Sequence, residues 1–224
     1  MTDDRDLEEL LTRRWTCRAY LPDALPRETI ERMLTLAQRT PSWSNTQPWQ
    51  VYVTGGDETE RFREAMVAWA QTADEHYDYG HPESFPDVLR ERRRATARQL
   101  YESVGIAWGD RAASAKQAQE NFRFFGAPHV AIVTAPAELG TYGAVDAGAY
   151  ITCLLLAAEA LGLGATAQAA IAGHSERVRA FFDMPENLRV VAAVSFGLPD
   201  LAHPVNQYRT HRATLDEAVV FRGA

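Results

Sequence analysis

The segment that most constrains the fold of this chain is a strongly apolar stretch from Asp146 to Leu163. Its centre reads "ITCLLLAAEALGLG", and small residues between the leucines allow other elements to pack closely against it. A helix without a convincing polar face has to be covered on most sides. The stretch carries Glu159 and is shorter than a membrane span of roughly 20 apolar residues, so we expect it in a protein core.

Runs rich in β-branched residues predict the strands. The clearest are "APHVAIVTA" at 127–135 and "LRVVAAVSFGLPD" at 188–200, on either side of the apolar helix. "WQVYVT" at 49–54 alternates as a strand does and ends at two glycines. "ATAQAAI" at 165–171 is expected to form a short strand or turn.

Helical patterns fill the intervals between these strands. Leu7, Leu10 and Leu11 have the spacing of one helix face near the N-terminus. Further helices are expected from Pro26 to the stop at Pro41, over 57–75, over 88–126 with a break at Gly105 or Gly109, and over 174–184. In the helix that starts at Pro26, Ile30, Met33, Leu34 and Ala37 share a face. In the helix over 57–75, the residues expected to be buried are Phe62, Met66, Val67 and Trp69. We therefore expect one sheet covered by helices on both faces, which is an α/β arrangement. The alternation of elements does not predict the order of the strands.

Composition limits the class of protein. A chain of 224 residues without repeats suits one domain with a sizeable core. Its net charge of −7 argues against a nucleic-acid partner. Cys17 and Cys153 lie far apart and are expected to be reduced, and the acidic N-terminus is unlike a signal peptide. We therefore expect a soluble cytoplasmic protein without a membrane partner.

The segment "RRWTCRAY" at 13–20 is the first polar cluster with chemical meaning. It places guanidinium groups and a hydroxyl where a helix is expected to end: Arg13, Arg14, Thr16 and Arg18. Guanidinium groups bind two phosphate oxygens at once, and a hydroxyl adds a donor. Basic residues at a helix end also offset the helix macrodipole. The residues alone leave both interpretations open.

The segment "PSWSNTQPW" at 41–49 is the second cluster. It combines small polar side chains with two large rings: Ser42, Ser44, Asn45 and Gln47, with Trp43 and Trp49. Such a set suits a polar heterocycle that needs donors along one edge and an apolar wall against its face. The alternative is a plain helix stop and strand start, with the tryptophans in the core.

The C-terminal stretch holds a third cluster, Arg209, His211 and Arg212, which suits an anion, although a tail of this composition is more often solvated surface. The arginines at 90–94 are expected to form a solvated helix face. The six histidines show no paired spacing, so no metal site is predicted. No G-x-S-x-G motif and no Cys–His arrangement indicates a hydrolase. Residues for holding a ligand without residues for proton transfer indicate a borrowed cofactor.

These motifs together carry a resemblance. The pattern R-x-[ST]-x-[RK]-x-[FY] from Arg14 to Tyr20, followed about 20 residues later by P-S-x-x-N-x-Q-P-W, resembles the FMN-dependent nitroreductase family. The order of the later segments agrees, so the resemblance covers almost the whole chain. The insert "YESVGIAWGDRAASAKQAQENFRFFGAP" is similar to the branch that includes nitrobenzoate reductases.

The resemblance implies an FMN site. Arg14, Thr16 and Arg212 would bind the phosphate, and Arg18 would lie near flavin N1 and O2. The loop at 41–47 would contact the flavin of a partner subunit, which makes the protein a homodimer. The backbone of Ala169 and Ala170 would approach flavin N5. The full set implied is Arg14, Trp15, Thr16, Arg18, Pro41, Ser42, Trp43, Asn45, Gln47, Asn121, Gln168, Ala169, Ala170, Arg209 and Arg212.

Three positions depart from the family pattern. Trp15 stands where relatives carry a small polar residue or His, which leaves its backbone amide as the contact. Ala169 replaces an acidic residue of some branches. Asn121 matches an Asn that binds the pyrimidine edge, although the insert shifts the alignment around it.

The fold implied by the resemblance is an α+β three-layer sandwich with a central, mostly antiparallel sheet. It forms a single domain over 1–224, with a helical insert at about 75–125 and a C-terminal arm at about 200–224. The apolar helix over 146–163 is the candidate for the dimer interface, because it lacks a polar face.

The implied activity is ping-pong hydride transfer from NADPH or NADH, through flavin N5, to a small aromatic electron acceptor, nitroaromatic or quinone-type. Alternatives on the same fold are a dehydrogenase, a reductive dehalogenase or a flavin-destroying enzyme. A non-catalytic flavin-binding protein is a further alternative. A flavin-free structural dimer would require all three arginine clusters to be solvated surface.

Overall fold

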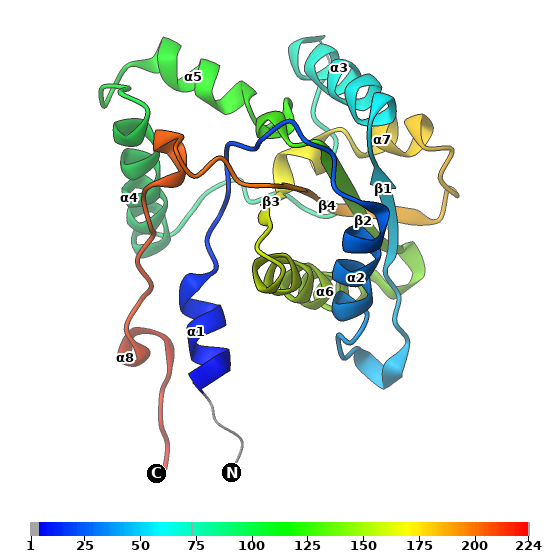
Figure 1. The fold of residues 1–224 in the computed structure, drawn as a ribbon. Coiled ribbons are helices and arrows are strands. Elements are labelled where there is room, and N and C mark those ends of the chain that lie inside the picture. Colours follow the sequence, from blue (N-terminus) through cyan, green and yellow to red (C-terminus); the bar gives the residue numbers. More distant parts are fainter. Residues whose placement is uncertain (1–4, 73, 224) are drawn as a thin grey trace.

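A central four-stranded sheet organises the molecule. The computed structural model describes residues 5–72 and 74–223, and in these the strands lie in the order β1-β2-β4-β3 (Figure 1). All three neighbouring pairs are antiparallel. The strands are β1 (Gln50–Thr54), β2 (His129–Pro136), β3 (Gly164–Gln168) and β4 (Leu188–Gly197). The antiparallel α+β sandwich is confirmed, whereas the α/β class predicted from helix and strand alternation alone is wrong.

Helices cover both faces of this sheet, with α2 and α6 on one side and α3 and α7 on the other (Figure 1). The helices are α1 (Arg5–Arg13), α2 (Arg27–Ala37), α3 (Asp57–Thr72), α4 (Asp87–Ser103), α5 (Arg111–Gln119), α6 (Gly140–Ala160), α7 (Ser175–Phe181) and α8 (Leu215–Ala218). Short 3-10 turns are η1 (Trp43–Asn45), η2 (Phe124–Gly126), η3 (Ala137–Leu139), η4 (Ala169–Gly173) and η5 (Pro204–Asn206). The segment predicted to form the first helix, "DRDLEELLTRRW", begins at Asp4, which lies outside the described residues.

Helix α6 begins earlier than the sequence predicted. It starts at Gly140 rather than Asp146, and its first turns hold Gly143 against the end of β2. A Cβ on Gly143 would lie 3.3 Å from the Cβ of Ala135, so glycine at this position serves close packing. Gly140 and Gly143 in the preceding stretch concealed the helix from propensity reasoning.

The run Ala137–Ala160 is, among the described residues, one helix long and apolar enough to cross a membrane by length and composition. The expectation that this segment is too short for a span is therefore wrong. Its buried residues, among them Tyr150 and Leu154, pack against the sheet and α2. The core helix of a globular protein can have the same composition, and the packing of α6 against the sheet and α2 shows that it is such a core helix.

Two apolar clusters sandwich the sheet. On the α6 side, Trp49 stacks on Tyr150 with ring centroids 5.0 Å apart. On the other side, Phe62 of α3 packs on Phe124 at 5.1 Å. Phe62 and Met66 are fully buried as predicted, whereas Val67 and Trp69 are only half-buried. The sheet therefore has a packed apolar layer on each face, and these layers hold its strands in place.

The segment that follows α1 lies along the β3 edge. The Cys17 amide donates to the carbonyl of Ala165 at 3.2 Å. The buried Tyr20 hydroxyl lies 3.0 Å from Thr166 Oγ1 and 3.1 Å from the carbonyls of both Cys17 and Ser195. Burial raises the pKa of the Cys17 thiol to about 11, so this cysteine is an unreactive packing residue.

The segment from α4 to α5 lies apart from this core (Figure 1). Neither helix contains a buried residue, and the arginines at 90–94 are exposed as predicted. Helix α4 is tied to the C-terminal segment by an Arg92–Glu217 ion pair of 3.2 Å. The predicted break falls between the helices, where Gly105 and Gly109 both adopt positive φ.

Candidate functional site

The two ends of the chain meet in one cavity of about 510 Å³, which we term the arginine pocket. It is lined by Leu11, Thr12, Arg14, Trp15, Thr16 and Arg18 from the N-terminal segment, by Thr96 of α4, and by Tyr208, Arg209, Thr210, His211 and Arg212. The first and third polar clusters of the sequence, about 190 residues apart, are thus parts of one site.

Positive charge in this pocket is only partly balanced by the protein. Burial lowers the pKa of Arg14, and the nearby Arg212 lowers it further, while Glu159 acts in the opposite direction. Among the described residues, neither Arg14 nor Arg212 forms an ion pair within 4 Å. Within the described residues, the Arg212 guanidinium donates to oxygens of Thr210 and to the His211 carbonyl. A bound anion would relieve the repulsion between the two arginines.

Neighbouring side chains position the other two arginines. The Arg209 guanidinium lies 4.5 Å from the centre of the Trp15 ring, a cation–π arrangement. The Arg18 amide donates to Asn206 Oδ1 at 2.8 Å, and Arg18 Nη1 donates to the Tyr208 hydroxyl at 2.9 Å. The sequence analysis did not identify Asn206 or Tyr208 as site residues. The sequence signal that could have indicated them was two polar residues at 206–207 directly before a tyrosine.

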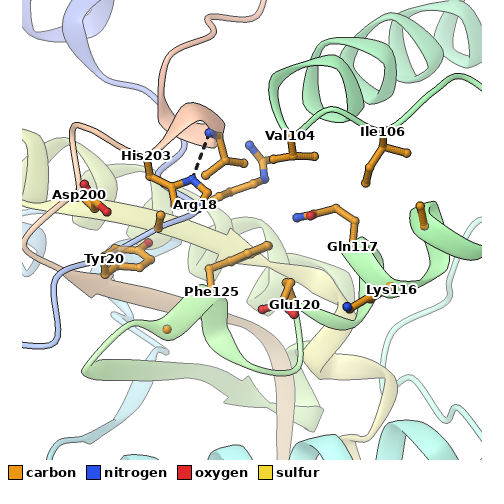
Figure 2. A pocket seen from close by; sticks show the side chains of 14 residues that line it. Arg18, Tyr20, Val104, Ile106, Lys116, Gln117, Glu120, Phe125, Asp200 and His203 are labelled. Carbon is orange, nitrogen blue, oxygen red and sulfur yellow. Dashed lines mark hydrogen bonds between the residues drawn. The ribbon is translucent and has the colours of Figure 1, made fainter.

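Arg18 also borders a second cavity, of about 550 Å³, which we term the α5 pocket (Figure 2). Its wall on one side comes from α5, with Lys116, Gln117 and Glu120 nearby, and its floor includes Phe125. Arg18 therefore stands between two cavities. A molecule in one of them is adjacent to a molecule in the other.

The loop at 41–47 has its hydrogen bonds largely within itself. The Gln47 backbone amide donates to Ser42 Oγ at 2.8 Å. Gln47 Nε2 lies 3.3 Å from Asn45 Oδ1. Ser44, Asn45 and Gln47 all adopt positive φ, which is uncommon for residues other than glycine. Strained backbone of this kind persists where surrounding contacts determine it, and it concentrates at functional sites.

This loop lies away from the arginine pocket within the chain. The Trp43 amide donates to the Asp146 carboxylate at 3.2 Å, and the Trp43 ring is 5.0 Å from that of Tyr142. No residue of 41–47 lines the arginine pocket. Asp146, buried at the N-terminal half of α6, is an anchor that sequence reasoning missed.

The remaining predicted residues lie at the end of β3 and in the turn after α5. Gln168 is buried, and its Nε2 donates to the Asn121 carbonyl at 2.7 Å while its Oε1 accepts from Ser195 Oγ. The side chain of Asn121 donates to Ala118 at 3.1 Å. Ala169 is exposed and Ala170 half-buried. Gln168 therefore links Asn121 to the backbone that leads into Ala169, while its own amide group is already engaged.

A family model described as the nitroreductase family matches residues 11–198. A nitroreductase of Mycolicibacterium smegmatis, NfnB, is 37% identical over 215 residues, covering 96% of this chain and 92% of that protein. A 4-nitrobenzoate reductase of a Nocardioides species is 32% identical over 93% of this chain and 86% of that protein. The crystal structure of FMN-dependent NfnB from Mycobacterium smegmatis with NADPH superposes with a TM-score of 0.91 at 36% identity, covering 97% and 98% of the two chains.

Proposed function

Because this chain belongs to the nitroreductase family, we propose that it is an FMN-dependent oxidoreductase that uses NAD(P)H to reduce nitroaromatic or quinone-type acceptors. The observation that carries the proposal is the arginine pocket. Arg14 and Arg212 line one cavity and repel each other, which favours a bound anion, and the family resemblance implies that both bind the FMN phosphate.

The donors in the pocket suit a phosphate monoester. Arg14 and Arg212 supply guanidinium groups, and Thr16 adds a hydroxyl in the same cavity. Arg209, held over Trp15, adds a third positive charge at the rim. A dianionic phosphate matches this excess better than a neutral ligand would. The residues present therefore fit the phosphate end of FMN.

The family resemblance implies that Arg18 lies beside the flavin ring. Asn206 and Tyr208 hold its backbone and its guanidinium, so the positive charge is in place before a ligand arrives. FMN, when bound, supplies hydride transfer. Arg18 would then stabilise negative charge on the ring by fixed electrostatics rather than by moving a proton.

A second copy of the chain completes the site in this proposal. Trp43, Tyr142 and Val145 are each about 60% exposed, and they form one apolar surface at the loop and the first turns of α6. Leu7 and Leu11 of α1 are also more than half exposed. Covering these residues in a homodimer brings Pro41, Ser42, Trp43, Asn45 and Gln47 of one subunit to the flavin of the other.

The same proposal treats 1–224 as one domain, with an insert at about 75–125 and an arm at about 200–224. The insert and the arm support each other, because Gln99 of α4 donates to the Arg209 carbonyl at 3.3 Å. Use of NAD(P)H favours a cytoplasmic location.

An absorbance spectrum of the purified protein, before and after anaerobic NADPH, tests the proposal. We expect flavin bands near ~450 nm that bleach with NADPH and return with nitrobenzene. Bands that NADPH leaves unchanged would indicate a non-catalytic flavin-binding protein. A colourless protein that ignores added FMN would overturn the proposal. Screening of acceptors separates a nitroreductase from a dehydrogenase or a dehalogenase on the same fold.

A further inference from the structure

We propose that Lys116 recognises an oxyanion on the substrate that enters the α5 pocket. The oxyanion is either the carboxylate of an aromatic acceptor or a phosphate group of NADPH, since the two share one recognition chemistry. The inference rests on the proposed function, because it takes FMN in the arginine pocket to make the α5 pocket a substrate site.

Lys116 is the only lysine of the chain; the other 22 of its 23 Lys and Arg residues are arginines. An arginine grips in a fixed planar fork, whereas a lysine is a compact charge on a flexible stem. The one lysine of the sequence therefore lines the α5 pocket, together with Arg18, which also lines the arginine pocket.

The pocket presents polar groups around an apolar floor. Lys116 and Gln117 extend from α5, and Arg18 reaches toward them from the opposite wall (Figure 2). Phe125 and Ile106 supply the apolar surface between them. An aromatic ring or a nicotinamide would pack on this surface, with its anionic group toward α5.

The charges of this pocket leave Lys116 available. Glu120 lies 3.5 Å from Arg123, which offsets its charge. Asp200 accepts from the Ala202 amide at 3.0 Å, near Tyr20 and away from Lys116 (Figure 2). Among the described residues, no carboxylate lies within 4 Å of the Lys116 amine. The uncompensated positive charge thus lies on the α5 side.

His203 adds a further polar group on the side opposite α5. Its Nδ1 accepts from the Val205 amide at 3.2 Å, so Nε2 carries the proton when the ring is neutral. The pocket therefore offers donors from the N-terminal segment, the C-terminal segment and α5. No single helix end accounts for this convergence.

A purely structural role for Lys116 makes different predictions. Lys116 lies in the last turn of α5, where a positive charge stabilises the helix dipole. That role affects stability alike with or without substrate. It gives no preference for anionic over neutral substrates.

The first experiment compares Lys116→Met, Lys116→Arg and Arg111→Met in the FMN-loaded enzyme. Arg111 is exposed on the same helix but does not line the pocket, so it controls for loss of charge. For Lys116→Met we expect kcat/KM for 4-nitrobenzoate to fall roughly 5- to 20-fold, with 4-nitrobenzamide unchanged, if the acceptor carries the oxyanion. If NADPH carries it, the Kd for NADPH in anaerobic flavin reduction rises by a similar factor instead.

Lys116→Arg should keep most of either effect, because the charge is retained. Changes below twofold in both arms, or equal losses with the benzoate and the benzamide, would overturn the proposal.

The second experiment needs no turnover. Acetylation of the holoenzyme with an amine-specific reagent can modify one lysine side chain, and peptide mass spectrometry measures its extent. We expect 4-nitrobenzoate or NADP⁺ to slow modification of Lys116, with 4-nitrobenzamide as the neutral control. Lys116 that is unreactive in the free holoenzyme, or equally reactive with every ligand, would contradict the proposal.

The two proposals fail separately. If the protein does not bind FMN, the spectrum shows it before any variant is made. If FMN binds and NADPH bleaches it while Lys116→Met behaves as wild type, only the role of Lys116 is lost.

Discussion

The arginine pocket and the loop at 41–47 are both polar, yet they differ in how their polar groups are paired. In the pocket, Arg14 and Arg212 repel each other, and no ion pair to either occurs among the described residues. In the loop, Ser42 and Asp146 accept the backbone amides, although the Trp43 ring stays exposed. An anionic ligand would therefore stabilise the pocket. The loop, in contrast, already has the conformation in which it could contact a ligand.

This difference explains why one chain gives only half of a site. An internally bonded loop keeps its conformation before a partner arrives, so it loses little freedom when it packs on a second subunit. An unbalanced charge cluster gains its stability only when an anion binds. The following changes test the two halves separately.

Arg14→Met should have the largest effect. It removes charge-assisted hydrogen bonds to phosphate, so FMN affinity should fall by about 1.5–3 kcal/mol, or roughly 10- to 150-fold. The FMN-free protein should be as stable as wild type or more so, because the repulsion from Arg212 is gone. Fluorescence titration and thermal unfolding measure the two quantities. The control is Arg13→Met, since Arg13 is paired to Glu159 at 2.9 Å; equal losses in both variants would contradict the assignment.

Mixed dimers test whether the loop acts on the partner. The variant Trp43→Ala/Asn45→Gly removes two predicted contacts, and glycine preserves the positive φ of Asn45. We expect roughly 5- to 20-fold weaker FMN binding. Co-expressed with Arg14→Met chains under separate tags, it should yield dimers with one intact and one doubly defective site.

Titration of such mixed dimers should therefore show half of the sites at wild-type affinity. If the loop serves its own chain, no site is restored. That result would contradict the proposal that the pocket of one chain and the loop of its partner form one site.

Arg18→Ala should shift the flavin midpoint potential rather than binding. Loss of the cation destabilises the reduced ring by roughly 1–3 kcal/mol, which lowers the potential by roughly 20–65 mV. Tyr208→Phe keeps the charge but removes its hydrogen-bond partner, so it should give a smaller shift. Redox titration with reference dyes is the measurement, and an unchanged potential in Arg18→Ala excludes the role.

Mild acid should have the smallest effect, a loss of folding stability that arises outside the arginine pocket and the loop at 41–47. Burial lowers the pKa of His129 and of His174, so each is neutral in the fold while the unfolded chain takes up protons near pH 6.5. Stability is therefore complete above about pH 6.5 and falls as the pH drops below it, by at most about 1.4 kcal/mol per pH unit for each histidine.

His174→Met should flatten this dependence, because neither nitrogen of that buried ring has a hydrogen-bond partner among the described residues. His129 differs: it accepts from the Leu25 amide at 2.9 Å and bonds the Thr54 carbonyl at 3.1 Å. Thermal unfolding between pH 7.5 and pH 5.5 provides the test. A slope in His174→Met as steep as that of wild type would contradict it.

Local signals in the sequence were sufficient for most elements. The helix of 27–37, the strand near 50–54 and the break between Gly105 and Gly109 follow from periodicity and glycine chemistry. Strand order did not follow, because Val51 pairs with Val133 across about 80 residues and no local pattern records the partner. The antiparallel arrangement came from the family resemblance.

The candidate site shows the same limit. Arginines near each terminus were identified from their chemistry, but their meeting in one cavity required the fold. Asp146 and Asn206 were missed because a single polar residue in an apolar or irregular stretch has no periodic signal. The apolar face of α1 was predicted from Leu7 and Leu11, yet both are exposed in one chain.

The contacts of Tyr20 have a consequence for how the cofactor is loaded. Its hydroxyl, at 3.0 Å from Thr166, joins the segment that carries Arg14 and Arg18 to the β3 edge, so this wall has the stiffness of the sheet. The opposite wall is different, because 211–223 is exposed throughout. Conformational entropy is therefore lost mainly by the C-terminal wall on binding, and the release rate of FMN should follow the ordering of that arm.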